Sequence, residues 1–225
     1  ATEIHLSQID SLKRYSESIA TRHNIGCTFS IESGSVPLAI CSKTEKLNAS
    51  LIIMGTDDTH NIFSHFFLGS TAYRVLRKTT CPLLTVPVSC NAEDFNNIVF
   101  PVRPINNSLQ KYHFLKSIIQ KNKASFYLLG ALDARHPEKF NTLKQLMERA
   151  VEHISGTILK VEHEYYVGDN RGKAVLEKGR NLNADLIVIT ASLTESIKQL
   201  FNKNYVRKII DNCSTPVLSI KPGFR

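Results

Sequence analysis

Short apolar runs alternate with longer stretches of helical apolar spacing along most of the chain. In the second half the apolar runs predict strands, and the stretches between them predict amphipathic helices. The expected strands are 97–102, 125–130, 157–166, 186–190 and 216–220, and the expected helices are 109–121, 137–154, 172–182 and 200–212. Strands and helices that alternate at this spacing form a parallel sheet with right-handed crossovers and helices on both faces. The fold class is therefore α/β.

The first half shows the same alternation but starts at a later point in it. We expect helices at 2–22 and 36–46 and strands at 26–31, 51–54 and 83–86. Nothing in the first half corresponds to 97–130, which holds two strands and a helix. A parallel sheet that lacked these elements would expose its central strands. We therefore expect the natural protein to contain them.

Two blocks of sequence occur twice, in the same order. Residues 47–54 (LNASLIIM) return as 182–189 (LNADLIVI) at an offset of 135, and 80–87 (TCPLLTVP) match 214–220 (STPVLSI) at an offset of 134 on the prolines. Internal repetition of this kind indicates one structural unit used twice. We expect two domains, an incomplete one at 1–90 that lacks its first strand-helix-strand and a complete one at 96–225.

The net charge of +8 comes entirely from the second half. Residues 1–95 hold 8 basic and 9 acidic residues, whereas residues 96–225 hold 20 and 11. Such an excess attracts nucleotide phosphates, nucleic acid or an acidic partner. Most of these basic residues lie on helix faces away from the apolar stripe, which favours a solvated surface. Anion or nucleic-acid binding through this half is the weaker alternative, because stacking aromatics and reading motifs are missing.

The cysteines and the hydropathy indicate the compartment. Five scattered cysteines, with no C-x-x-C pair, predict free thiols in a reducing environment. No run approaches the roughly 18 apolar residues that a membrane span needs. We expect a cytoplasmic protein with no membrane partner. We also expect no metal site, because the loop that contains Asp57, Asp58, His60 and His65 is of ordinary loop composition.

Catalytic motifs are missing from the sequence. It contains no nucleophile elbow, no Walker loop and no His-Glu-x-x-His. We therefore expect no catalytic residues and no enzymatic activity, with a weak ATPase activity as the alternative.

Three stretches of the first half carry a family resemblance. Residues 49–56 (ASLIIMGT), 69–72 (GSTA) and 80–86 (TCPLLTV) together resemble the closing half of a universal stress protein. The resemblance extends over both copies, at 26–87 and 97–222. It implies a Rossmann-like, adenine nucleotide alpha hydrolase-like fold with five parallel strands. Because family members pair through strand five, it implies that 83–86 lies beside 217–220. A homodimer is a further partnership that it allows.

Some members of this family bind ATP through Gly-x-x-Gly, nine residues, then Gly-Ser/Thr. Glycines let the backbone approach the phosphates, and amides at a helix start donate to them. The resemblance implies that the cofactor-binding residues of the first copy are Gly55, Thr56, Asp58, Gly69, Ser70 and Thr71. However, Asp58 replaces the second glycine, and the spacer is one residue longer than the pattern. Asp57 and Asp58 would also repel a triphosphate.

The second copy departs further from the nucleotide-binding pattern. Thr190 stands for the first glycine, Lys203 for the third and Asn204 for the hydroxyl residue, and Arg103 replaces the acid expected after the first strand. The glycine cradle is therefore lost. We expect a non-catalytic stress-response or signalling module with degenerate nucleotide loops, no cofactor and an unidentified protein partner. The alternative is a sensor of ATP or another adenine nucleotide that uses the first copy.

Overall fold

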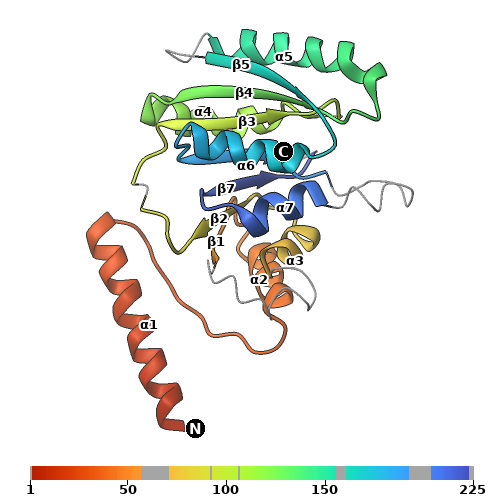
Figure 1. Cartoon of the computed structure of the whole chain (residues 1–225). Helices are drawn as coiled ribbons and strands as arrows, with labels where there is room; N and C mark the ends of the chain where they lie inside the picture. The colour runs from red at the N-terminus through yellow and green to blue at the C-terminus, as the bar shows by residue number, and fades with distance from the viewer. Residues whose placement is uncertain are drawn as a thin grey trace.

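The computed structural model describes residues 2–56, 71–91, 93–105, 107–155, 161–192 and 204–222. Its centre is one seven-stranded sheet with the strand order β1-β2-β7-β6-β3-β4-β5 (Figure 1). The strands are β1 (Ile52–Thr56), β2 (Leu83–Pro87), β3 (Asn97–Val102), β4 (Ser125–Leu132), β5 (Val161–Val167), β6 (Leu186–Thr190) and β7 (Val217–Ile220). The α/β fold with a mostly parallel sheet is confirmed.

The sheet runs without a break from the first unit into the second. Neighbouring strands are parallel within each unit, whereas β2 and β7 are antiparallel. At this junction Leu83 lies opposite Ser219, Leu84 opposite Leu218 and Thr85 opposite Val217. The Thr85 hydroxyl also donates to the Val217 carbonyl at 3.3 Å.

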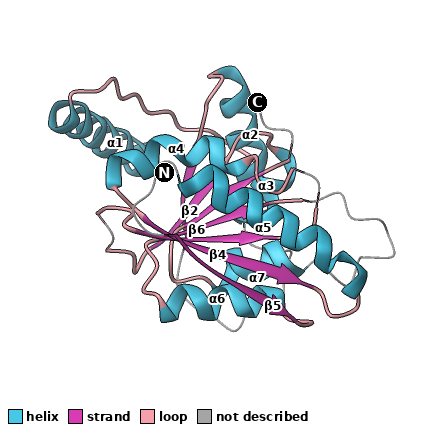
Figure 2. Ribbon diagram, turned by 90° about the horizontal axis from the view of Figure 1, so that it is seen from above, coloured by secondary structure: helices cyan, strands magenta, loops and turns pink. Residues whose placement is uncertain are grey.

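Helices cover both faces of the sheet. The described helices are α1 (Thr2–His23), which does not cover the sheet, and α2 (Val36–Lys46), α3 (Thr71–Lys78), α4 (Lys111–Asn122), α5 (Phe140–Ser155), α6 (Arg171–Asn181) and α7 (Asn204–Asn212), and a short 3₁₀ turn (Pro137–Lys139) precedes α5. Around the second unit, α4 and α5 lie on one side of the strands and α6 and α7 on the other (Figure 2). One apolar cluster joins α2, α3, α6 and α7 across both units, and a second lies under α4 and α5. No helix among the described residues is long and apolar enough to span a bilayer.

The repeated Leu-Asn-Ala sequence is a helix stop that occurs at the same place in both units. Asn48 follows α2 with φ 48°, and Asn183 follows α6 with φ 46°. Asparagine tolerates this left-handed conformation better than most residues. In each unit the next amide closes the helix end, from Ala49 to the Thr44 carbonyl at 3.0 Å and from Ala184 to the Gly179 carbonyl at 2.9 Å. The sequence repeat therefore encodes a local structure.

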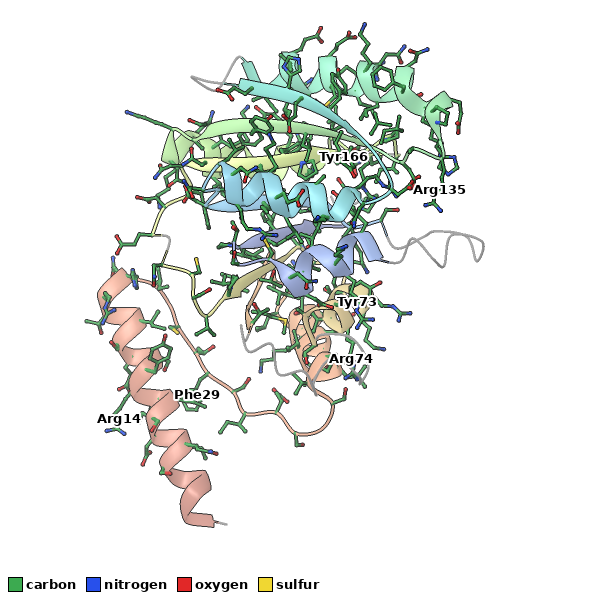
Figure 3. All side chains as sticks on the ribbon, viewed as in Figure 1. Arg14, Phe29, Tyr73, Arg74, Arg135 and Tyr166 are labelled. Carbon is green, nitrogen blue, oxygen red and sulfur yellow. The ribbon has the colours of Figure 1, made fainter. Side chains whose placement is uncertain are left out.

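The expected strand at 26–31 is wrong, because this segment is not a strand in the structure. In the second unit, β3 and β4 lie between β6 and the equivalent strand β5. The described part of the first unit has no counterparts of β3 and β4, so the segment has no neighbour to pair with. Phe29 and Ile31 are 39% and 44% exposed. Both α1 and this segment stand away from the sheet (Figures 1 and 2). Phe29, which belongs to the segment, is labelled in Figure 3.

Candidate functional site

Open parallel sheets bind ligands at the carboxyl ends of their strands, where the strand order reverses. In the second unit this point lies between β3 and β6, because the chain runs from β3 to β5 on one side and then crosses to β6. Arg103 directly follows β3, and Thr190 ends β6. The equivalent strand of the first unit, β1, ends at Gly55 and Thr56.

The structure describes three of the six residues expected to bind a nucleotide in the first unit. Gly55 and Thr56 end β1, and Thr71 is the first residue of α3. Asp58, Gly69 and Ser70 lie outside the described residues, as do Asp57, His60 and His65.

Gly55 lies in an open environment. It is exposed, and a β-carbon at this position would meet no heavy atom of the described residues within 4 Å. Neither packing nor a left-handed backbone conformation therefore requires glycine here.

In the second unit, Arg103 lies at the end of β6, the strand that is equivalent to β1. Its side chain donates from Nη2 to the Thr190 carbonyl at 3.0 Å, and the residue is only 3% exposed. Its backbone amide donates to Oγ of Ser108 at 3.3 Å, and the Thr190 hydroxyl donates to the Ser108 carbonyl at 3.1 Å. These three residues tie the ends of β3 and β6 to the loop that leads into α4. The Ser108 hydroxyl accepts from the Arg103 amide, and no side-chain hydrogen bond caps α4.

Tyr205 forms the other side of this contact. The repeat offset of 134 places Tyr205 in α7 where the first unit has Thr71. The Arg103 guanidinium carbon lies 4.2 Å from the centre of the tyrosine ring, and that of Arg171 lies 5.9 Å from it. Both distances allow cation–π attraction. Burial raises the pKa of Tyr205, although the two arginines oppose the shift.

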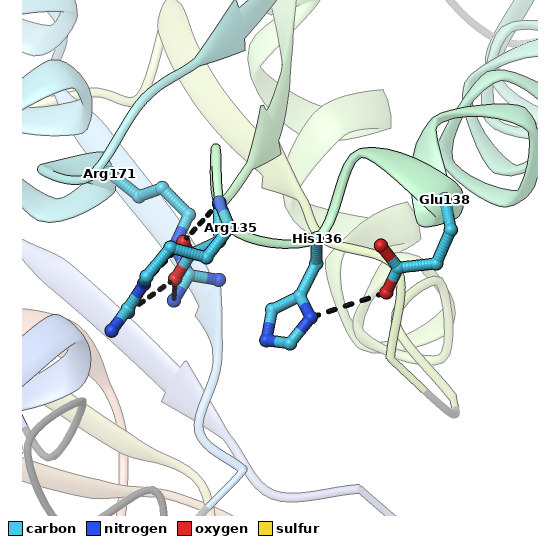
Figure 4. Close-up of polar contacts among 5 residues, drawn as sticks. Arg135, His136, Glu138 and Arg171 are labelled. Atoms are coloured by element: carbon cyan, nitrogen blue, oxygen red, sulfur yellow. Dashed lines mark hydrogen bonds and ion pairs between the residues drawn. The ribbon is translucent and has the colours of Figure 1, made fainter.

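The carboxylate of Asp133 contacts both Arg135 and Arg171 near this point (Figure 4). Asp133, which follows β4 and is 2% exposed, accepts from Arg135 Nη2 at 2.8 Å and pairs with Arg171 Nη2 at 3.2 Å. Hydrogen bonding to Asp133 raises the pKa of Arg135. One carboxylate therefore faces two guanidinium groups, which leaves this end of the second unit basic.

Lys111 is a buried basic residue beneath the same loop. Its ammonium donates to the carbonyls of Pro101 and Val188, and it lies 4.0 Å from the centre of the Phe100 ring. Burial lowers the pKa of Lys111 well below its usual value, and the charge of Arg103 acts in the same direction. Lys111 thus links β3 to β6 through its two hydrogen bonds, which an apolar side chain could not form.

Sequence reasoning identified only part of this arrangement. It found Arg103 and Thr190, but it missed Tyr205, Lys111 and the carboxylate of Asp133. The repeat offset could have found Tyr205. Lys111 occupies the apolar stripe of α4 four residues before Leu115, which is a signal of burial. Asp133 and its partner Arg171 are far apart in sequence and share no local pattern.

The arrangement holds charge but offers no evident catalytic group. Among the residues that the structure describes, no three histidine, cysteine, aspartate or glutamate side chains lie close enough to hold a metal ion. The polar side chains at the ends of β3 and β6 bind to backbone carbonyls and to one another. These contacts fix the loop and the strand ends in place.

Comparisons with known proteins agree with this architecture. Residues 3–87 match the model of the universal stress protein family. No curated protein matches the chain. A universal stress protein from Archaeoglobus fulgidus is similar in structure, with 19% identity and a TM-score of 0.72 over 99% of this chain and 78% of that one. A functionally unknown protein from Pseudomonas aeruginosa PAO1 has 14% identity and a TM-score of 0.68 over 97% and 78%.

These two likenesses extend over both units and show a common fold. The family match falls on the first unit, and the second unit repeats its strands, helices and helix stop. The first unit thus matches the universal stress protein family, and the chain as a whole shares its fold with these two proteins.

Proposed function

We propose that this protein is a non-catalytic stress-response or signalling module whose second unit has replaced its nucleotide site with side-chain contacts. The observation that carries the proposal is the position of Arg103, which is hydrogen-bonded to Thr190 and packed on Tyr205 at the point where such sheets bind ligands. A nucleotide would have to displace this buried guanidinium.

The energy of that displacement is large compared with nucleotide affinity. A hydrogen bond to a charged group contributes about 1.5–3 kcal/mol, and a desolvated cation–π contact about 2 kcal/mol. A micromolar ligand gains about 8 kcal/mol in total. Losing roughly half of that would weaken a micromolar site to the millimolar range.

Exposed apolar side chains support a protein partner that binds the first unit. Ten of the thirteen large apolar side chains that are most exposed in the structure lie before residue 90. Three of them flank or belong to α2: Val36 is 56% exposed, Leu38 54% and Leu47 64%. Three exposed apolar side chains on and beside one short helix favour a contact surface.

An adenine-nucleotide sensor that uses the first unit is the second candidate. The open environment of Gly55 favours it, because the equivalent Thr190 is buried and bonded to Ser108. A glycine that packing does not require leaves its backbone open to a ligand.

Calorimetry with ATP on the whole chain separates the two candidates. The proposal expects no heat of binding at millimolar ATP. Binding that is lost on Gly55→Val would establish the sensor and overturn the proposal.

Removing the side chains that occupy the nucleotide position of the second unit tests the role of Arg103 directly. Replacing Arg103→Ala together with Tyr205→Thr should make ATP binding measurable if these side chains block the site. Lys173→Ala removes an exposed positive charge of the same unit and is the matched control. If the double variant is folded by circular dichroism but shows no ATP binding, Arg103 and Tyr205 are not what prevents binding.

The partner surface can be tested by placing charge on it. Val36→Glu with Leu38→Glu should abolish recovery of any protein that co-purifies with the wild type. Phe140→Glu, which changes an exposed apolar residue of the second unit, should leave that recovery intact. Equal loss with both variants would argue against a surface on α2.

A further inference from the structure

We propose that the cavity between α4 and α5 binds a small organic carboxylate with an apolar body. This α4–α5 cavity has a volume of about 260 Å³. Residues of β3, the loop that follows it, α4 and α5 line it. The inference does not depend on the proposed function of the chain.

The floor of the cavity is apolar and buried. Phe100, Ala150 and Ile154 line it and are 0%, 2% and 1% exposed. They belong to the apolar cluster under α4 and α5. A methylene chain or small ring placed against them would leave water at little cost in protein rearrangement.

The rim of the cavity is basic. Arg149 and His153, four residues apart on α5, and His113 on α4 all line the cavity and are exposed. No aspartate or glutamate is among the residues that line it. A guanidinium binds a carboxylate through two parallel hydrogen bonds. This charge complementarity selects an anionic head group over a neutral one.

His153 is oriented for such a head group. Its Nδ1 lies 2.8 Å from the Arg149 carbonyl, a contact in which Nδ1–H donates. The hydrogen bond fixes the ring on the side of α5 that carries Arg149, and the imidazolium form of the ring would donate Nε2–H to a carboxylate.

The volume limits the size of the ligand. A water molecule takes up about 30 Å³ in the liquid, so the cavity holds a molecule of roughly six to ten non-hydrogen atoms. Drug-sized and nucleotide ligands occupy pockets of about 300–1,000 Å³, which is larger than this one. A small ligand of this size binds with a Kd of about 1 mM.

Nuclear magnetic resonance of the whole chain with hexanoate as the probe tests the proposal. Hexanoate should shift the amide signals of 107–113 and 146–154 and saturate at millimolar concentration. The matched neutral probe, 1-hexanol, should bind at least about tenfold more weakly, because it lacks the charge. Equal affinity for the two probes, or shifts confined to other parts of the chain, would overturn the proposal.

Two variants of α5 assign the binding to the basic rim. Arg149→Gln should weaken hexanoate about tenfold and leave 1-hexanol unchanged. Lys144→Gln removes a charge from the same helix but outside the cavity, and should have no effect. If Arg149→Gln retained wild-type affinity, the proposed carboxylate site would be wrong.

Filling the cavity provides an independent readout. Ala150→Leu should abolish the shifts caused by both probes, and the spread of amide signals without ligand reports whether the variant folds. Should Ala150→Leu unfold the chain, the comparison of Arg149→Gln with Lys144→Gln still decides the question. A folded Ala150→Leu variant that binds hexanoate normally would place the ligand elsewhere and refute the proposal.

Discussion

Equivalent elements of the two units lie in different environments. Ile53 in β1 is 64% exposed, whereas Val188, its counterpart in β6, is 0% exposed. Leu12 in α1 is 39% exposed, whereas Leu143 in α5, the equivalent helix, is 0% exposed. The difference arises because β3, α4 and β4 cover this side of the second unit only. Similar sequence therefore gives similar elements, but it gives a core only where neighbouring elements are present.

Features that need no distant neighbour are alike in both units. The stops at Asn48 and Asn183 have nearly the same φ. The comparison thus separates local structure, which both units share, from burial, which they do not.

The largest expected difference between the two units is the loss of stability when a leucine is truncated on α5 and on α1. Leu143→Ala removes a fully buried side chain and should lower the free energy of unfolding by about 3 kcal/mol. Leu12→Ala should lower it by less than about 0.5 kcal/mol, because the side chain is already partly in water. Denaturation in urea measures both. Equal losses would mean that α1 packs as tightly as α5 in solution.

The pH dependence of stability should reveal Lys111, which has no counterpart in the described first unit. Its folded pKa is depressed, so between that value and the ordinary lysine pKa the unfolded chain binds one more proton. Stability from Lys111 therefore rises with pH in this window, by up to about 1.4 kcal/mol per pH unit. Lys111→Met should remove this rise.

The difference between wild type and Lys111→Met isolates this effect. The pKa values of Cys41, Cys81 and Cys213 are raised by burial, which lowers stability as pH rises, but both proteins share these groups. Urea denaturation at intervals from pH 7 to 9.5 gives the difference. Parallel curves would show that Lys111 keeps its proton in the folded state.

The helix stops should respond equally in the two units. Asn48→Ala and Asn183→Ala each place a β-carbon with no local hydrogen bond in the left-handed region, so each should cost about 1 kcal/mol. Asn48→Gly and Asn183→Gly are the controls, and they should cost little. A clear inequality in thermal unfolding would show that the surroundings, and not the turn itself, set the energy of the stop.

The smallest expected effect concerns the ion pairs that two equivalent lysines make with nearby glutamates. Lys178 lies 2.6 Å from Glu164, and Lys43, at the equivalent position, lies 3.5 Å from Glu32. The side chain of Lys178 is 22% exposed and that of Lys43 is 42% exposed. Double-mutant cycles to alanine should give a coupling of about 0.5–1 kcal/mol for the first pair and near zero for the second. The reverse order would contradict the difference in burial.

The sequence was a good guide to whatever depends on local pattern. Apolar periodicity predicted the five strands and four main helices of the second unit, with some ends displaced by a few residues. The same rules failed at 26–31, because a strand also needs a neighbour, and none is described there.

The candidate site was less predictable than the fold. A repeat offset identifies which residue stands for a missing glycine, and so it pointed to Thr190. It does not reveal that Arg103 would lie on Tyr205, because that contact depends on how β3 and α7 are placed. Half of the expected nucleotide-binding residues of the first unit fall outside the described residues, so that prediction stays open.

The antiparallel junction between β2 and β7 has a further consequence for how the sequences of the two units can evolve. Residues 88–96 tether the units, and a short tether gives an effective concentration of about 1 mM, enough to keep even a 10 µM contact about 99% closed. The junction therefore needs little affinity of its own. Since each molecule always contains one copy of each half, a substitution can settle in one half without appearing in the other. Such an arrangement permits division of labour that two identical subunits could not achieve.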